Sequence, residues 1–180
     1  MFPGLDAFSR AYLFVDFFFL LSGFVLGLSI DPKLRAGLAP FAFLRLRWLR
    51  LWPMILVGVA LGAVPFALVN DLATTLPLLL LAALLLPSFA VPAVPWPLNL
   101  PHWSLAMEVL ANLAHAIILH RLANRALVLL AGAMGLALAV AIARAGGSDV
   151  GEGAFAWDIA LLRIGFAYPL GLAMARGHAG

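Results

Sequence analysis

Three ionisable side chains stand inside long apolar runs of this sequence and could do chemistry there. They are Asp16, Glu108 and Arg163. A charge at the centre of a membrane-spanning helix costs about 2.5–3.5 kcal/mol on insertion scales, so such a residue commonly has a function. The alternative is a side chain close enough to the membrane interface to remain hydrated. Asp16 and Glu108 are therefore candidate catalytic carboxylates, and Arg163 is a candidate substrate-binding residue.

A polar stripe accompanies Glu108. Ser104, Glu108, Asn112 and His115 follow one another at spacings of four, four and three residues, which places them on one face of a helix. The stripe predicts contact with substrate or with polar groups of neighbouring helices, as in an interhelical hydrogen-bond seam. We take Ser104 and Asn112 as candidate substrate-binding residues. His102, just before this helix, is a candidate general base, and the alternative is an ordinary interfacial histidine.

A basic motif, Arg47-x-x-Arg50-x-x-Pro53, carries the other candidate chemistry. Two guanidinium groups three residues apart on a helix point the same way and can bind a phosphorylated ligand. On spacing alone, anchoring at the membrane surface or contact with anionic lipid is the better explanation of the motif, because basic clusters at helix starts are common. The sequence contains no cysteine, and no His, Asp or Glu spacing indicates a metal site.

The composition defines the setting of these residues. Of 180 residues, 65% are hydrophobic and only 11% are charged, and the mean hydropathy is +1.09. A soluble surface needs far more charge, so we predict an all-α integral membrane protein with a single membrane domain over residues 1–180. The net charge of +3 reflects basic residues in loops and at helix ends and does not indicate nucleic-acid binding.

Five apolar segments are predicted to span the membrane. They are residues 11–30, 48–69, 103–120, 126–143 and 157–175, with approximate bounds. The segment 72–95 is different, because its dense apolar part has only 11 residues and six prolines lie between Pro77 and Pro101. If this segment is re-entrant, eight basic residues lie on one side of the membrane and two on the other; if it spans, the division is six to four. The positive-inside rule favours the re-entrant arrangement.

This topology gives each buried charge a depth. Asp16, Glu108 and Arg163 then lie five or six residues from the outer ends of their helices, or about 8–9 Å below the outer boundary at 1.5 Å per residue. We expect them to share a polar cavity that opens outward.

Three motifs in this order resemble those of the acyltransferase-3 family of membrane acyltransferases. They are Val15-Asp16-Phe17-Phe18-Phe19-Leu20-Leu21-Ser22-Gly23-Phe24, the Arg47-x-x-Arg50-x-x-Pro53 motif, and Trp103-Ser104-Leu105-Ala106-Met107-Glu108. A weaker similarity covers Arg163, Phe166 and Gly171. The likeness extends over about residues 10–175.

The resemblance implies transfer of an acyl group, often acetyl, from acyl-CoA to a hydroxyl of a carbohydrate or lipid-linked glycan. It implies a multi-pass protein of the cell (inner or plasma) membrane, in contact with lipid, with acyl-CoA as co-substrate and no permanently bound cofactor. By this likeness Arg47 and Arg50 hold the phosphates of the donor, whereas Asp16, Glu108 and Arg163 shape the acceptor side.

The family pattern also includes a preceding helix with a catalytic histidine, and about ten spans. We therefore expect this sequence to represent part of such a domain, without the first helix and the C-terminal helices. The alternatives are a non-catalytic membrane scaffold or partner subunit, and a small transporter fragment whose buried charges line a path.

Overall fold

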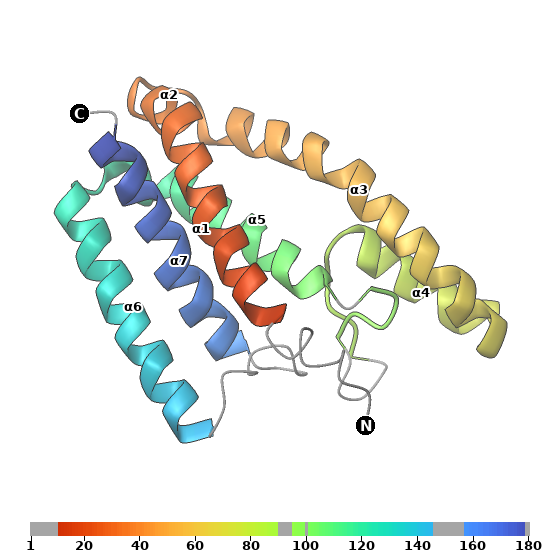
Figure 1. The fold of residues 1–180 in the computed structure, drawn as a ribbon. Coiled ribbons are helices and arrows are strands. Elements are labelled where there is room, and N and C mark those ends of the chain that lie inside the picture. The colour runs from red at the N-terminus through yellow and green to blue at the C-terminus, as the bar shows by residue number, and fades with distance from the viewer. Residues whose placement is uncertain (1–10, 90–94, 100, 146–156, 179–180) are drawn as a thin grey trace.

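The computed structural model describes residues 11–89, 95–99, 101–145 and 157–178, and these residues are mainly helical (Figure 1). The helices are α1 (Ala11–Ser29), α2 (Asp31–Arg35), α3 (Pro40–Val69), α4 (Leu72–Ala83), α5 (His102–Ile117), α6 (Asn124–Ala145) and α7 (Trp157–His178), with a 3-10 turn, η2, at Leu119–Arg121. The predicted all-α class is confirmed for the described residues. By length and composition α3, α6 and α7 can cross a membrane, and the total of five spans stays a prediction.

Proline and aspartate set several helix boundaries. Pro40 occupies the first turn of α3, where its missing N–H costs nothing, so this helix begins eight residues before the predicted position 48. Asp71 caps α4 by accepting a hydrogen bond from the Thr74 N–H at 2.7 Å. After α4 the chain turns at Leu85, whose φ of 57° lies in the left-handed region. Because α3 begins at Pro40, the basic motif of Arg47, Arg50 and Pro53 lies within one continuous helix of 30 residues.

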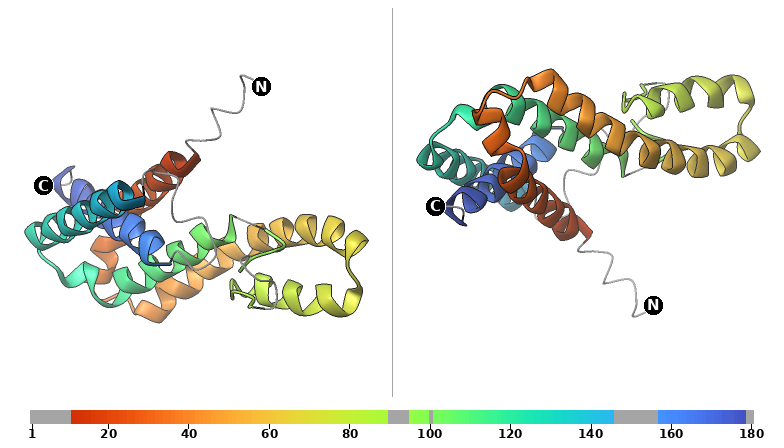
Figure 2. Two further views of the ribbon diagram at one scale, coloured as in Figure 1. Left: turned by 90° about the horizontal axis from the view of Figure 1, so that it is seen from below. Right: turned by 90° about the horizontal axis from the view of Figure 1, so that it is seen from above.

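Helices α1, α7 and α6 form one side of the molecule (Figures 1 and 2). The first two run in parallel and approach closely at two glycines. A Cβ at Gly23 would meet the Tyr168 carbonyl oxygen, and a Cβ at Gly171 would meet the Leu20 carbonyl oxygen. Helix α6 packs on the other side of α7, where the Phe166 ring covers Gly135. Small residues allow such close packing between membrane helices, where van der Waals contact drives association.

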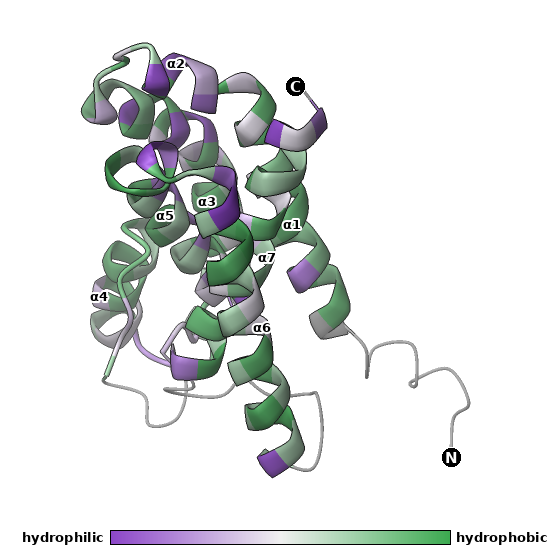
Figure 3. Cartoon of the chain, turned by 90° about the vertical axis from the view of Figure 1, so that its left-hand side faces the viewer, coloured by the Kyte–Doolittle hydropathy of each residue, from purple (hydrophilic) through white to green (hydrophobic). Residues whose placement is uncertain are grey.

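Helix α5 joins this layer to α3. It runs parallel to α1, because Glu108 contacts Ser22 and His115 contacts Asp31. It runs antiparallel to α3, because Glu108 also contacts Arg47 while the His115 ring lies 6.2 Å from the Phe43 ring. Figure 3 shows hydrophilic positions gathered at the end of the molecule that carries α2 and the C-terminal end of α7. The re-entrant arrangement also places α1 and α5 in parallel, and that arrangement stays a prediction.

Helix α4 folds back along the second half of α3. The Trp52 indole N–H donates a hydrogen bond to the Ala83 carbonyl at 3.2 Å. The chain then returns, so that the Leu98 carbonyl packs against Gly62. Residues 90–94 of the predicted re-entrant segment lie outside the described residues. The path is that of a segment which enters and leaves on one side, and its position in a membrane stays a prediction.

The close contact between α1 and α7 predicts that a larger side chain at a contact glycine destabilises the fold. Gly171→Ala should lower the free energy of unfolding by about 1–3 kcal/mol, because the new Cβ collides with backbone that cannot move aside. Gly132→Ala is the control, since no atom lies within 4 Å of its Cβ. Unfolding of the protein in micelles, followed by circular dichroism, measures both. Equal midpoints for the two variants would contradict the close approach.

Candidate functional site

Glu108 lies at the junction of three helices. Its side chain is fully buried, and its Oε1 accepts a hydrogen bond from Arg47 Nη2 at 2.6 Å. The same oxygen accepts a hydrogen bond from the Ser22 hydroxyl. Ser22 comes from α1, Arg47 from α3 and Glu108 from α5. We call these three residues the Glu108 centre.

The Glu108 centre is a charge pair in an apolar setting. The Arg47 side chain is 16% exposed and the Glu108 side chain 0%. Removing two charges from water carries a large penalty, which only close pairing and further hydrogen bonds offset. Two polar atoms of the centre, Glu108 Oε2 and Arg47 Nε, have no hydrogen-bond partner of normal geometry in the described part of the chain. The centre is thus held in place by one short charged contact and one hydroxyl, both at Glu108 Oε1.

Asp16 and Arg163 form a second, separate pair. Arg163 Nη1 donates to Asp16 Oδ2 at 2.6 Å, and the Arg163 side chain is 1% exposed. Glu108 contacts Ser22 instead, six residues further along α1, which corresponds to about 9 Å. The expectation that all three charges lie at one level is therefore wrong. Distance from the helix ends does not give the relative level of Glu108 and Asp16, because α5 contacts α1 further along its length, at Ser22.

The other predicted site residues lie around these pairs. His102 is fully buried, and neither ring nitrogen has a hydrogen-bond partner within the described residues. Ser104 uses its hydroxyl to donate to the Pro101 carbonyl at 2.8 Å, as in the first turn of many helices. Arg50 is exposed on α3, one turn from Arg47. Their assigned roles stay predictions.

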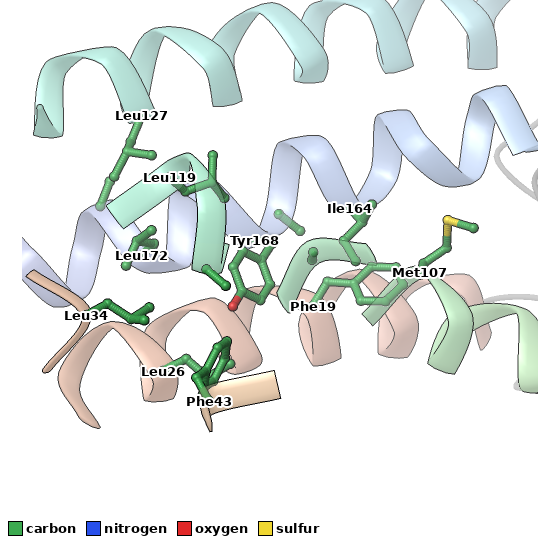
Figure 4. Packing of buried hydrophobic residues seen from close by; sticks show 14 of the residues in the cluster. Phe19, Leu26, Leu34, Phe43, Met107, Leu119, Leu127, Ile164, Tyr168 and Leu172 are labelled. Atoms are coloured by element: carbon green, nitrogen blue, oxygen red, sulfur yellow. The ribbon is translucent and has the colours of Figure 1, made fainter. Parts of the chain in front are cut away.

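A buried network continues the polar stripe of α5 beyond Glu108. The Tyr168 hydroxyl donates to Asn112 Oδ1 at 3.4 Å and lies 3.0 Å from His115 Nδ1. His115 Nε2 in turn lies 3.0 Å from Asp31 Oδ1. All four residues are at most 2% exposed. Figure 4 shows the Tyr168 ring packed among hydrophobic neighbours, so its hydroxyl must find polar partners within the protein.

Arg176 fixes the end of this network. It donates to both carboxylate oxygens of Asp31, at 2.8 and 2.7 Å, and to the carbonyls of Leu119 and Leu122 at 3.2 and 2.7 Å. Burial raises the pKa of the Asp31 carboxyl, but hydrogen bonds from His115 and Arg176 outweigh it and hold the pKa at about 2. The Asp31 carboxylate thus joins the start of α2 to α5 and α7, and Arg176 extends the contact to η2.

Sequence reasoning missed Asp31, Tyr168 and Arg176 as parts of a site. Asp31 and Arg176 directly follow apolar runs, a position typical of charges that only mark the end of a helix. Tyr168 offers one signal, since its hydroxyl stands in the middle of an apolar segment and needs a partner. The predicted seam at Asn112 and His115 was one of two alternatives, and the structure shows that these residues do bond across helices.

A cavity of about 360 Å³ lies between α3 and α5 beside the Glu108 centre. Its wall is mainly apolar and includes Arg45, Arg47 and Asn112. In the described ranges no group of three His, Cys, Asp or Glu side chains is arranged to hold a metal ion.

Apolar helices around a buried, partly unsatisfied charge pair define a helical membrane protein with a polar site between α1, α3 and α5. The family described as "Acyltransferase domain" matches residues 4–179 of this sequence. The chain therefore belongs to the acyltransferase-3 family, and the resemblance predicted from its motifs is confirmed. It is similar to "Protein 2 in picA locus" of Rhizobium radiobacter, with 34% identity over 126 residues. That match covers 60% of this chain and 66% of the relative. No solved structure matches.

The Glu108 centre predicts a non-additive effect on stability. Arg47→Met should lower the free energy of unfolding by about 3–5 kcal/mol, because it leaves the Glu108 charge buried without a partner. The double variant Arg47→Met/Glu108→Met should recover most of this loss. Unfolding in mixed micelles measures both, with Arg50→Met as the control at an exposed position of the same helix. Losses that simply add would show that the two side chains do not interact.

The low pKa of Asp31 in the folded protein predicts that the protein loses stability in acid. Its pKa is lower in the folded protein, about 2, than the usual 3.8, so its contribution is complete above about pH 4 and disappears as the pH falls toward 2. Asp31→Asn should lower the unfolding midpoint at neutral pH and reduce the difference between pH 5 and pH 2. Asp158→Asn, at an exposed position of α7, is the matched control. An unchanged acid dependence in Asp31→Asn would contradict the network.

Proposed function

We propose that this chain carries the reaction centre of a membrane O-acyltransferase, which moves an acyl group from acyl-CoA to a hydroxyl of a carbohydrate or lipid-linked glycan. One observation carries the proposal. Ser22, Arg47 and Glu108 come from three different family motifs, more than 80 residues apart at the extremes, and their side chains meet at one carboxylate oxygen. Structural needs alone do not require that the three motifs converge on a buried charge.

The centre suits acyl transfer chemically. The acceptor hydroxyl attacks the thioester carbonyl carbon, the carbon–sulfur bond breaks, and the hydroxyl proton is passed to the departing thiolate, so the products are an ester and CoA. Glu108 Oε2, which has no partner in the described residues, can receive that proton on the way. The Arg47 guanidinium keeps the carboxylate in position and offers positive charge near the developing oxyanion.

The donor's phosphates fit the exposed end of the basic motif. Arg50 is exposed one turn after Arg47 on α3, and Arg45 is exposed two residues before Arg47. A guanidinium can form two parallel hydrogen bonds to a phosphate. We assign Arg50 to the donor's phosphates and Arg47 to the link between donor and Glu108. The pair of Asp16 and Arg163, with Ser104, belongs to the acceptor side, and the protein works in the cell membrane.

Release of CoA tests the proposal cleanly, because the chain has no cysteine that would react with a thiol reagent. Purified protein in nanodiscs with acetyl-CoA or longer acyl-CoA and a mixture of sugar acceptors should release free thiol. Glu108→Gln should reduce the rate at least about 100-fold, as expected for loss of a group that transfers a proton. Arg50→Ala should mainly raise KM for acyl-CoA, by about 10- to 100-fold for one charged hydrogen bond.

Arg144→Ala, at an exposed position at the end of α6, is the control for both variants. Binding of acyl-CoA without release of thiol would favour the non-catalytic scaffold. A protein that neither binds acyl-CoA nor releases thiol would refute the proposal.

A further inference from the structure

A second cavity, of about 420 Å³, lies at the end of the molecule that carries α2. It is bounded by the end of α1, by α2, by the start of α6 and by the end of α7. Its lining combines polar side chains with apolar and small residues. The polar ones are Asp31, Arg35, Asn124 and Arg176, and the others include Gly27, Leu28 and Ala175.

Basic residues far outnumber acidic ones around this cavity. Within residues 29–36, 119–126 and 174–178 there are five Lys or Arg residues and one acidic residue, Asp31. With neutral histidines, these three stretches therefore carry an excess of four positive charges. Figure 3 shows the hydrophilic positions gathered at this end. Such a concentration of one sign of charge attracts an anion.

Arg35 can offer this charge to a ligand. Its side chain is 46% exposed, and its Nε lies 3.2 Å from Asp31 Oδ2. Its Nη2 donates to the Leu122 carbonyl at 3.1 Å. These contacts engage two of the five N–H donors of a guanidinium and hold the group at the cavity wall. Arg176 is only 11% exposed and is the main partner of Asp31, so one carboxylate serves two guanidinium groups and leaves one positive charge in excess.

The apolar part of the cavity suits a lipid better than a soluble anion. The cavity lies where α6 begins and α7 ends, and both helices are long and apolar enough to cross a membrane. It is thus at the level where lipid headgroups meet hydrocarbon. Leu28, which lines the cavity, is 42% exposed, and Met174, next to the lining residue Ala175, is 51% exposed. Apolar surface therefore continues from the cavity along the helices.

We propose that this cavity binds an anionic phospholipid, such as phosphatidylglycerol. Its phosphate oxygens accept hydrogen bonds from Arg35 and from the Asn124 amide, and the first part of an acyl chain packs on Leu28. A guanidinium matches a phosphate through parallel hydrogen bonds, and basic pockets between membrane helices suit acidic headgroups. The positive-inside rule assigns this end to the inner leaflet. The site is separate from the Glu108 centre and does not depend on the proposed function.

Native mass spectrometry of the protein in detergent tests the site, with no acyl-CoA present. The protein is titrated with dioleoyl-phosphatidylglycerol and with dioleoyl-phosphatidylcholine, which has the same chains and the same phosphodiester but adds a positive choline. The first phosphatidylglycerol should bind at least about ten times more tightly, because the excess positive charge attracts the anionic headgroup. Glycerol 3-phosphate, which has no chains, should not displace it at equal concentration.

Two variants probe the cavity, and a third is the control. Arg35→Gln should remove most of the preference for phosphatidylglycerol, while Asp31 keeps Arg176 and His115 as partners. Asn124→Asp should do the same by placing a negative charge in the cavity. An aspartate is also favourable in the first turn of a helix, so this variant should fold normally. Lys33→Gln removes the same charge as Arg35→Gln, from an exposed position of α2 outside the cavity lining, and should retain the preference.

Loss of the preference in the first two variants and its retention in Lys33→Gln would support the site. Equal binding of the two lipids would overturn it. If Lys33→Gln weakens phosphatidylglycerol binding as much as Arg35→Gln does, the attraction belongs to the whole basic end and the cavity is no site. Displacement by glycerol 3-phosphate would show a site for a soluble anion and would refute the lipid.

Discussion

A buried carboxylate needs a partner, and this requirement at Glu108 determines how the helices of this protein meet. Arg47 supplies the charge and Ser22 supplies a hydroxyl, so α1, α3 and α5 must approach one point. The penalty for leaving Glu108 unpaired exceeds what most single apolar contacts contribute, because hydrocarbon offers it no water. Helix α3 contacts the rest of the molecule chiefly through α5 and α4, and the charge pair fixes its rotation relative to α5.

Two further polar contacts hold the frame around this point. The Asp16–Arg163 pair joins the first halves of α1 and α7. The Asp31–Arg176 pair joins the start of α2, directly after α1, to the C-terminal end of α7. Between the two pairs, Gly23 and Gly171 let the backbones touch. This part of the molecule is therefore fixed at three levels along its length, which keeps Ser22 at the level of Glu108. The network through His115 and Tyr168 extends the same support to Asn112, so the cavity wall beside the Glu108 centre is also held in one arrangement.

The sequence predicts the helices well because apolar runs and prolines mark them directly. Residues 11–30 and 157–175 differ from α1 and α7 by at most three residues at either end. Glu108, Arg47 and Asn112 were recognised as candidates because charged and polar side chains are costly in such runs. Their partners could not be predicted, since spacing within one helix does not tell which neighbour it crosses or at what depth. This is why the sequence predicts a shared level for Glu108 and Asp16, and why its pattern does not reveal that Asp31, which is 2% exposed, belongs to a buried network.

The contact between Arg47 and Glu108 in a lipid bilayer is the most direct test of this account. The sequence has only two glutamates, Glu108 and Glu152, so a protein with ¹³C-labelled glutamate side chains gives few carboxylate signals, and Glu108→Gln assigns them. Solid-state NMR dephasing between the Glu108 carboxylate carbon and ¹⁵N-labelled arginine should show a contact within about 4 Å, as in a paired carboxylate and guanidinium. That dephasing should disappear in Arg47→Lys. A Glu108 carboxylate that shows no arginine nitrogen nearby, or keeps its dephasing without Arg47, would contradict the account.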